Sequence, residues 1–269
     1  MRVLTDRDID RVPFSIILEA VRAHVLADFR GETISPPRHA VEFGDGGIVF
    51  TVGGTPSFAG FRAYETFHEP ALEKEDQLIA VWDRATRRLA GLAIGERLGA
   101  LRTGALGGVA IDLMAAPDGR RLAVIGTGLQ AETQLIAAAS VSSFSGIAVF
   151  SRSRENAAAF ALRMSAVLGV SIAAADSAEQ AVKDADIVIL ATNSSTPVIE
   201  TAWLKPGAHI NTLGPKRQSA HDLPLEIAAG AALIASDSPQ QVAAMGDEHM
   251  LHGHQASART LHLGDPKVL

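Results

Sequence analysis

The stretch Arg120–Leu135, RRLAVIGTGLQAETQL, carries the strongest structural signal in this chain. A short apolar run leads into Gly126 and Gly128, and the sequence then continues at helical spacing with Ala131. The first glycine permits a tight turn after a strand, the second lets the backbone approach a pyrophosphate, and a small third residue allows close helix–strand packing. This pattern predicts a dinucleotide-binding turn at a helix N-terminus, with a purely structural tight turn as the alternative.

Short apolar runs alternate with alanine-rich segments of helical spacing from residue 121 onward. Strands that alternate with helices of this length indicate βαβ units, so we predict an α/β fold with a Rossmann doubly wound parallel sheet. Ser177 followed by Gln180 is typical of a capping box at the start of one helix. The six predicted strands are RLAVIG, GIAVFSR, SIAAAD, DIVILATN, AHINTLG and AALIASD.

Residues 1–116 have a different pattern, which predicts a smaller α+β domain with an antiparallel sheet. PFSIILEAVRAHVLADFRG predicts an amphipathic helix that Asp10 caps and Gly31 ends. AVEF-GDGG-IVFTV and QLIAVWD-RATR-RLAGLAI predict two hairpins. The turn residues of APDGRR, 116–121, mark a domain boundary. We therefore assign 1–116 to a substrate-binding and dimerisation domain, completed by 246–269, and 117–245 to the dinucleotide-binding domain.

The composition of the 269 residues is that of a globular protein with a sizeable core: 47% are hydrophobic and 20% charged. The absence of cysteine excludes disulfides and a thiolate nucleophile. A net charge of -6 disfavours nucleic acid and anionic membranes as partners. The N-terminus has no apolar signal region, and no run of about 18 apolar residues is present. We expect a cytoplasmic protein without a membrane or nucleic-acid partner.

The tip of the second predicted Rossmann strand, VFSRSRE, bears on the choice of cofactor. A site that prefers NAD usually has an acidic residue there, whereas this chain has Ser151, Arg152, Ser153 and Arg154, and Glu155 follows too late. Two guanidinium groups and two hydroxyls suit a 2′-phosphate. The sequence therefore favours NADP(H), with NAD(H) as the alternative; a helix cap with solvated charges is the non-functional interpretation.

Five segments together resemble the ornithine cyclodeaminase/mu-crystallin family: RLGALRTGALGGVAIDLMA, VIGTGLQAETQLIAA, VFSRSRENAAAFA, ADIVILATNSSTPVI and LKPGAHINTLG. The resemblance is most specific between Ala100 and Gly214. It implies a Rossmann domain inserted into a domain that forms a homodimer and builds the substrate site, with hydride chemistry at an amino-acid α-carbon. The expected cofactor contacts are Thr103, Gly126, Thr127, Gly128, Leu129, Gln130, Ser151, Arg152, Ser153, Thr192, Asn193 and Leu213.

The resemblance also implies that three cations surround a substrate carboxylate: Arg38 in ISPPRHA, Arg62 in FAGFRAYETF and Arg102 in ALRTGA. A guanidinium binds a carboxylate through two parallel hydrogen bonds and so fixes the substrate α-carbon. Arg62 stands where the family usually has lysine. Because arginine remains protonated, the acid–base role that a lysine could have does not carry over to Arg62.

A second departure from the family lies in NTLGPKRQSAHDLPLE. Cyclodeaminases of the family carry an aspartate two residues after the glycine that matches Gly214, and this chain has Lys216 there. A lysine ammonium cannot accept a proton from a substrate ammonium. If the protein instead reduces an imine, the candidate proton donors are Lys216, a water molecule and the protonated imine itself. Asp222 matches a different acidic position of the family, or it stabilises the loop.

Histidines and acidic residues gather in GDEHMLHGHQ, residues 246–255, but zinc needs three or four converging ligands and glycine disfavours a rigid helical site. We therefore expect a polar surface loop and no metal. Family members also continue beyond the LGD of residues 263–265 with a further helix, so this chain is expected to be either a short member or truncated.

The leading functional hypothesis is an NADP(H)-dependent oxidoreductase that reduces a cyclic ketimine or another imino acid next to a carboxylate. A cyclodeaminase that converts ornithine to proline and ammonia is the first alternative. A protein that binds NADP(H) and a small ligand without turnover is the second.

Overall fold

The computed structural model describes residues 2–67 and 77–268. The chain divides into two compact units, Met1–Arg102 and Thr103–Leu269. This division falls within helix α3 (Arg97–Met114), whereas the sequence placed the domain boundary in the loop after that helix. Residues 246–269, which the sequence assigned to the first domain, are grouped with the second unit.

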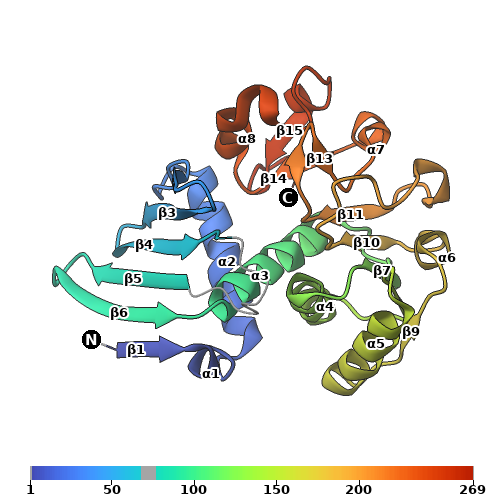
Figure 1. The fold of residues 1–269 in the computed structure, drawn as a ribbon, viewed down its shortest axis with the longest axis horizontal. Coiled ribbons are helices and arrows are strands. Elements are labelled where there is room, and N and C mark those ends of the chain that lie inside the picture. The colour runs from blue at the N-terminus through green and yellow to red at the C-terminus, as the bar shows by residue number, and fades with distance from the viewer. Residues whose placement is uncertain (1, 68–76, 269) are drawn as a thin grey trace. The chain divides into compact units, whose positions relative to one another are not determined.

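The first unit contains a six-stranded sheet in the order β1-β6-β5-β4-β3-β2 (Figure 1). Its strands pair in antiparallel fashion except for β1, which runs parallel to β6. Both predicted hairpins are confirmed, as β2–β3 and β5–β6. The strands are β1 (Arg2–Thr5), β2 (His39–Glu42), β3 (Gly47–Gly54), β4 (Phe58–Glu65), β5 (Gln77–Asp83) and β6 (Arg88–Ile94).

The predicted helix of this unit is α2 (Phe14–Phe29), which buries Ile17 and Val25. It ends as predicted, because Gly31 adopts the left-handed conformation at φ 69°. The prediction that Asp10 caps α2 is wrong. A separate short helix, α1 (Asp6–Ile9), comes first, and Asp10 terminates it and pairs with Arg97 at 2.6 Å.

The second unit contains a five-stranded parallel sheet in the order β11-β10-β7-β8-β9, which confirms the predicted α/β class. The predicted helix start at Ser177 is also confirmed, since its Oγ accepts from Gln180 N. Gln180 Oε1 accepts from Asp176 N instead of completing the box at Ser177. The elements are β7 (Arg121–Ile125), α4 (Leu129–Val141), β8 (Gly146–Phe150), α5 (Arg154–Leu168), β9 (Ile172–Ala174), α6 (Ala178–Val182), β10 (Ile187–Leu190), η1 (Thr201–Trp203) and β11 (His209–Thr212).

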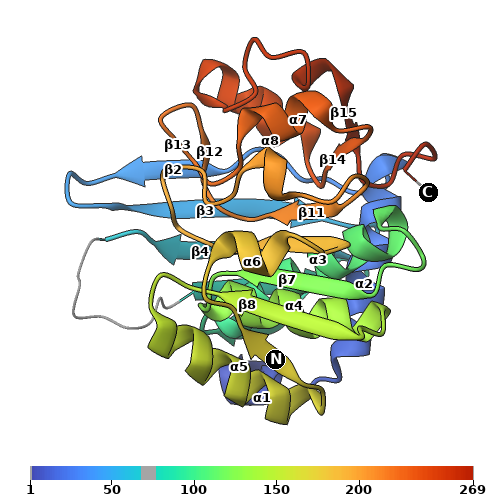
Figure 2. The ribbon, with the colours of Figure 1, turned by 90° about the vertical axis from the view of Figure 1, so that its right-hand side faces the viewer.

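The sixth predicted strand forms, as β14 (Ile234–Ser236), but it does not join the five-stranded sheet. It pairs in parallel with β15 (Thr260–His262). This pair lies with α7 and α8 beyond the β11 edge of the sheet (Figures 1 and 2). The remaining elements are β12 (Lys216–Arg217), β13 (Ala220–His221), α7 (Leu225–Gly230), α8 (Pro239–Met245), η2 (Gly246–Glu248) and η3 (Ser257–Arg259).

The core of the second unit consists of two apolar clusters, which share the parallel sheet. Val124 and Ile189, on the central strands, pack with Leu135 of α4 and Phe160 of α5 in one cluster. The other cluster contains Val182 of α6. Because β7 and β10 are covered on both faces, their sequences are continuously apolar. Among the described residues, no helix is long and apolar enough to cross a membrane.

Candidate functional site

The carboxyl ends of β7, β8, β10 and β11 lie at one edge of the sheet, because these strands are parallel. The chain proceeds from β7 outward to β8 on one side and later returns to β10 on the other. Ligands of open α/β sheets bind at such a reversal, outside the carboxyl ends of the strands. The loops that gather there are 126–128, 151–153, 191–193 and 213–216.

The glycine turn after β7 has the geometry that a dinucleotide requires. Gly126 has φ 117°, and a Cβ at this position would lie 2.2 Å from Ala191 O, so no larger residue fits. Gly128 is the N-cap residue of α4, and a Cβ there would meet no atom of the described residues within 4 Å. Ala131 is fully buried against the sheet. The first turn of α4 therefore presents backbone N–H groups beside an accessible glycine, which fits a pyrophosphate.

The four polar residues after β8 have separate roles in the structure. Ser153 caps α5, because its Oγ accepts from Asn156 N at 3.1 Å, and Ser151 Oγ accepts from Ser153 N. Arg154 forms an exposed ion pair with Asp176 at 3.1 Å. Arg152 is exposed and has no hydrogen-bond or ion-pair partner within residues 2–67 and 77–268. Of the two arginines predicted to bind phosphate, Arg154 is thus in an ion pair, and Arg152 has none among the described residues.

The other residues expected at the cofactor differ in exposure. Thr103 lies on α3, and its carbonyl oxygen accepts from Gln134 Nε2 at 2.9 Å. Gln130 lies in the first turn of α4, with an Oε1 that is buried without a hydrogen-bond donor among the described residues. Asn193 is exposed after β10, and Leu213 packs partly buried against the apolar core.

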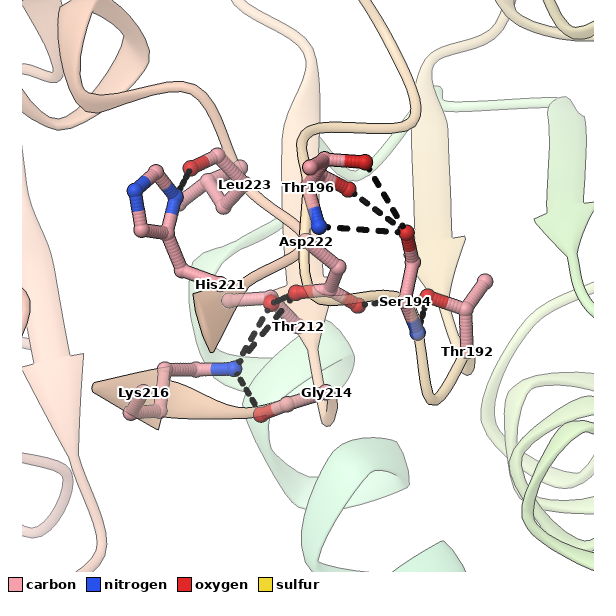
Figure 3. Close-up of polar contacts among 9 residues, drawn as sticks. All are labelled: Thr192, Ser194, Thr196, Thr212, Gly214, Lys216, His221, Asp222 and Leu223. Atoms are coloured by element: carbon pink, nitrogen blue, oxygen red, sulfur yellow. Dashed lines mark hydrogen bonds and ion pairs between the residues drawn. The ribbon is translucent and has the colours of Figure 1, made fainter. Parts of the chain in front are cut away.

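A buried carboxylate joins the ends of β10 and β11 (Figure 3). The Asp222 side chain is 0% exposed. Its Oδ1 accepts from Thr212 Oγ1 at 2.9 Å, and its Oδ2 accepts from Thr192 Oγ1 at 3.2 Å. A Cβ on Gly214 would lie 2.2 Å from Asp222 Oδ2, so the glycine makes room for this carboxylate. The sequence did not identify Thr212, although its position at a strand end, before Gly214, was the available signal.

Lys216 folds back over the same cluster. Its Nζ donates to Gly214 O at 2.5 Å and to Thr212 Oγ1 at 3.0 Å, and it lies 3.7 Å from Asp222 Oδ1. The lysine side chain is 28% exposed, so the ammonium lies at the boundary between the cluster and solvent. Burial lowers the pKa of Lys216 below its ordinary value of 10.5, and the charge of Asp222 opposes this shift.

His249 approaches this loop from the C-terminal segment. Burial lowers its pKa below 6.5, and the charge of Lys216 lowers it further. Met250 N donates to Lys216 O at 2.8 Å, which ties the segment to β12. His221 is turned away from the carboxylate and bonds Leu223 O instead (Figure 3). Within the described part of the chain, no three His, Asp or Glu side chains converge as metal ligands do.

The first unit brings two of the three predicted substrate arginines to one tyrosine. The Arg62 guanidinium lies 4.3 Å from the Tyr64 ring centroid, and its Nε donates to Gln77 Oε1 at 3.0 Å. Arg38, which is exposed, reaches Tyr64 Oη at 3.5 Å. Arg102 lies on α3, one turn after Gly99. A Cβ on that glycine would lie 3.7 Å from Arg62 Nη2, so this face of α3 adjoins Arg62.

Comparison with known proteins identifies relatives along almost the whole chain. The model of the ornithine cyclodeaminase/mu-crystallin family matches residues 11–265. Ketimine reductase mu-crystallin of Mus musculus is 29% identical over 184 residues, which are 68% of this chain and 58% of the mouse protein. The chain thus spans little more than half the length of that relative.

Two solved structures have the same fold and 28% sequence identity. One is Thermococcus litoralis Δ1-pyrroline-2-carboxylate reductase in complex with NADH and L-proline, with a TM-score of 0.83 over 95% of this chain and 79% of that one. The other is a lysine cyclodeaminase in a study of L-lysine, L-ornithine and L-2,4-diaminobutyric acid recognition, with a TM-score of 0.81 over 99% of this chain and 83% of that one.

Proposed function

The chain belongs to the ornithine cyclodeaminase/mu-crystallin family, and we propose that it is an NAD(P)H-dependent reductase of a C=N bond next to a carboxylate, most simply in a cyclic ketimine. The observation that carries this proposal is the Lys216–Asp222 pair at the end of β11. The family resemblance implies a carboxylate at this position in cyclodeaminases, whereas this chain has the cation Lys216. The reductases among the relatives support the same direction.

The glycine turn supports a dinucleotide as cofactor, because Gly126 and Gly128 fit the tight turn and the close approach. A bound reduced nicotinamide would supply the hydride that adds to the imine carbon. We propose NADP(H) as the preferred form. Arg152 has no ion-pair partner in the described part of the chain and is exposed for a 2′-phosphate, Ser151 and Ser153 lie beside it, and residues 151–154 include no acidic side chain.

Arg38, Arg62 and Arg102 are proposed to hold the substrate carboxylate. Arg38 and Arg62 meet at Tyr64, and Arg102 lies one helical turn from the glycine that adjoins Arg62. Bidentate pairing would fix the orientation of the substrate carboxylate and of the imine carbon next to it. This is a positioning function, since arginines do not exchange protons at ordinary pH.

Lys216 is proposed as the proton donor. Reduction of a neutral imine requires a hydride at carbon and a proton at nitrogen, and the Lys216 ammonium carries protons at a partly exposed position. A lowered pKa favours proton release to the imine nitrogen as the hydride adds to the carbon. Asp222 and Thr212 would hold the ammonium in place during the transfer.

A panel of cyclic imino acids assayed separately with NADPH and NADH tests the proposal. We expect oxidation of the dinucleotide that depends on the imine, with formation of the corresponding cyclic amino acid. A protein that binds the dinucleotide and an amino acid in calorimetry, but does not turn over any imine, would instead be a binding protein. Ornithine incubated with catalytic NAD tests the cyclodeaminase alternative through release of ammonia.

We further propose that the first unit forms a homodimer through the sheet. Strand registers place alternate residues of β3, β4, β5 and β6 on one face. Several large apolar residues of this face are exposed, and a hollow among them is lined by Phe50, Val52, Ala59, Gly60, Phe61 and Trp82. A second copy would cover it, as the family resemblance implies. The exposed members are Phe50, Val52, Leu78, Trp82 and Ile94.

A further inference from the structure

Two buried amides hold helix α3 from within the second unit, and the proposed chemistry does not use them. Gln134 of α4 is 1% exposed, and its Nε2 donates to Thr103 O at 2.9 Å. Asn211 of β11 is 9% exposed, and its Nδ2 donates to Gly107 O at 3.0 Å. The two acceptors are one helical turn apart, so both bonds reach the same face of α3.

Glycines of α3 allow α4 to come this close. A Cβ on Gly104 would lie 2.6 Å from Thr133 O, and a Cβ on Gly107 would lie 1.9 Å from Gln134 Oε1. Alanine at Gly107 would therefore displace the Gln134 amide from its position. The bond from Gln134 to Thr103 depends on this close approach.

The amide at Gln134 is costly if packing is its only task. Its Oε1 is buried and accepts no hydrogen bond from the described residues. A methionine would fill a similar volume without burying an unpaired oxygen. The second amide, that of Asn211, also has a polar neighbour, since its Oδ1 lies 2.9 Å from His209 Nε2. Burial lowers the pKa of His209, so a neutral ring can donate this bond.

We propose that Gln134 and Asn211 are positioning residues, which fix the rotation and translation of α3 and thereby the orientation of Thr103 and of Arg102, the next residue in the same helix. The inference rests on the proposed function, because it assigns Thr103 to the cofactor and Arg102 to the substrate carboxylate. The amides supply direction that an apolar contact lacks, since a hydrogen bond restricts sliding along the helix axis.

Gln134→Met tests this proposal in the full chain. We expect the KM for the imine to rise roughly tenfold to a hundredfold, as for a small misplacement of a binding group. The melting temperature should remain close to that of the unmodified protein, whereas the Kd for the dinucleotide should rise as well, because Thr103 is assigned to the cofactor. Gly107→Ala should raise KM in the same way by displacing the amide. Thr133→Val is the matched control, because it removes only a bond to Gln130 O within α4 and should leave KM unchanged.

Hydrogen exchange of the α3 backbone gives a readout that needs no turnover. Gln134→Met should accelerate exchange at amides 104–108, whereas Thr133→Val should not. An unchanged KM in Gln134→Met would overturn the proposal. So would a clear fall in melting temperature that accompanies the rise in KM in both Gln134→Met and Gly107→Ala, because the effect would then be one of general stability. If the unmodified protein reduces no imine, the proposed function fails by itself, and unaltered exchange in Gln134→Met would then reject the positioning role separately.

Discussion

The Lys216 ammonium lies 3.7 Å from the Asp222 carboxylate, and both side chains share the hydroxyl of Thr212. This pair converts what would be an isolated buried negative charge into a neutral cluster. The Asp222 carboxylate at the end of β11 is itself 0% exposed. We therefore expect the stability of the loop and the choice of reaction to depend on the same two residues.

The pair predicts a loss of stability in Lys216→Met. Removing one partner leaves the buried Asp222 uncompensated, so the free energy of unfolding should fall by about 3 kcal/mol. Adding Asp222→Asn to this variant should restore part of the loss. Denaturant unfolding measures both effects. Arg217→Met is the control, because its pair with Glu248 is on the surface and should contribute less than about 1 kcal/mol.

The pH dependence of turnover should report Lys216. Since its pKa is lowered from 10.5, the ammonium loses its proton below that pH, and activity that uses this proton should fall as pH rises through the lowered value. Lys216→Arg should abolish this basic limb, because arginine keeps its proton, and should lower kcat. A limb that persists unchanged in Lys216→Arg would assign the titration to another group. The measurement is kcat against pH with saturating imine.

The fold was predictable where the signal is local. Strand–glycine–helix spacing around Gly126 identified the Rossmann turn, and alternation with turn residues identified both hairpins. The sequence was less informative about which strands pair. An apolar run predicted β14, but its pairing with β15 depends on residues far along the chain. The prediction that Asp10 caps α2 was wrong because the four-residue helix α1 precedes α2. A helix this short leaves no periodic pattern in the sequence.

The candidate site shows the same limit. The sequence identified both Lys216 and Asp222 as candidate residues, but it did not predict that Asp222 is buried. One of the hydroxyls that bind its carboxylate belongs to Thr192, which lies 30 residues earlier in the chain. The same holds for Arg154, whose pairing with Asp176 needs the fold of β9 to be known. The sequence thus identified the charged residues at the strand ends, but it did not predict which of them form ion pairs with one another.

The difference between Arg152 and Arg154 predicts where cofactor preference originates. Arg152→Asp should weaken NADPH relative to NADH by tenfold or more, since a charge-assisted contact contributes about 1.5–3 kcal/mol. Arg154→Gln should change the ratio much less, because Arg154 already pairs with Asp176. Calorimetric titration of both dinucleotides measures the ratio. Equal affinity of the unmodified protein for the two forms would contradict the assignment.

The apolar face of the first unit predicts the assembly state. Val52→Glu should convert a dimer into monomers, because a buried, unpaired carboxylate at the interface is strongly unfavourable. Val52 is 58% exposed in the single chain, so the substitution should not disturb folding of the monomer. Leu162→Glu, on α5 at 77% exposure, is the control and should leave the dimer intact. Light scattering decides, and a monomeric unmodified protein at micromolar concentration would refute the interface.

The final prediction is that this protein does not convert ornithine to proline. Cyclodeamination requires a group that holds a substrate ammonium and manages protons as ammonia leaves, which suits a carboxylate. Lys216 instead presents a positive charge, and two like charges about 4 Å apart repel by about 4 kcal/mol at an effective dielectric of about 20. Asp222 is a poor replacement, since it is fully buried and its oxygens already accept from Thr192 and Thr212.

Ammonia and proline measured from ornithine with catalytic NAD should therefore remain at background, while imine reduction by the same preparation proceeds. Lys216→Asp should not by itself create efficient cyclodeamination, because Arg62 also stands where the family usually has lysine and cannot release a proton. In addition, the new carboxylate would lie near the buried Asp222, and two negative charges at that distance would repel each other. Rapid ammonia release from ornithine by the unmodified protein would show that another group manages the substrate amine, and the assignment of Lys216 would then be wrong.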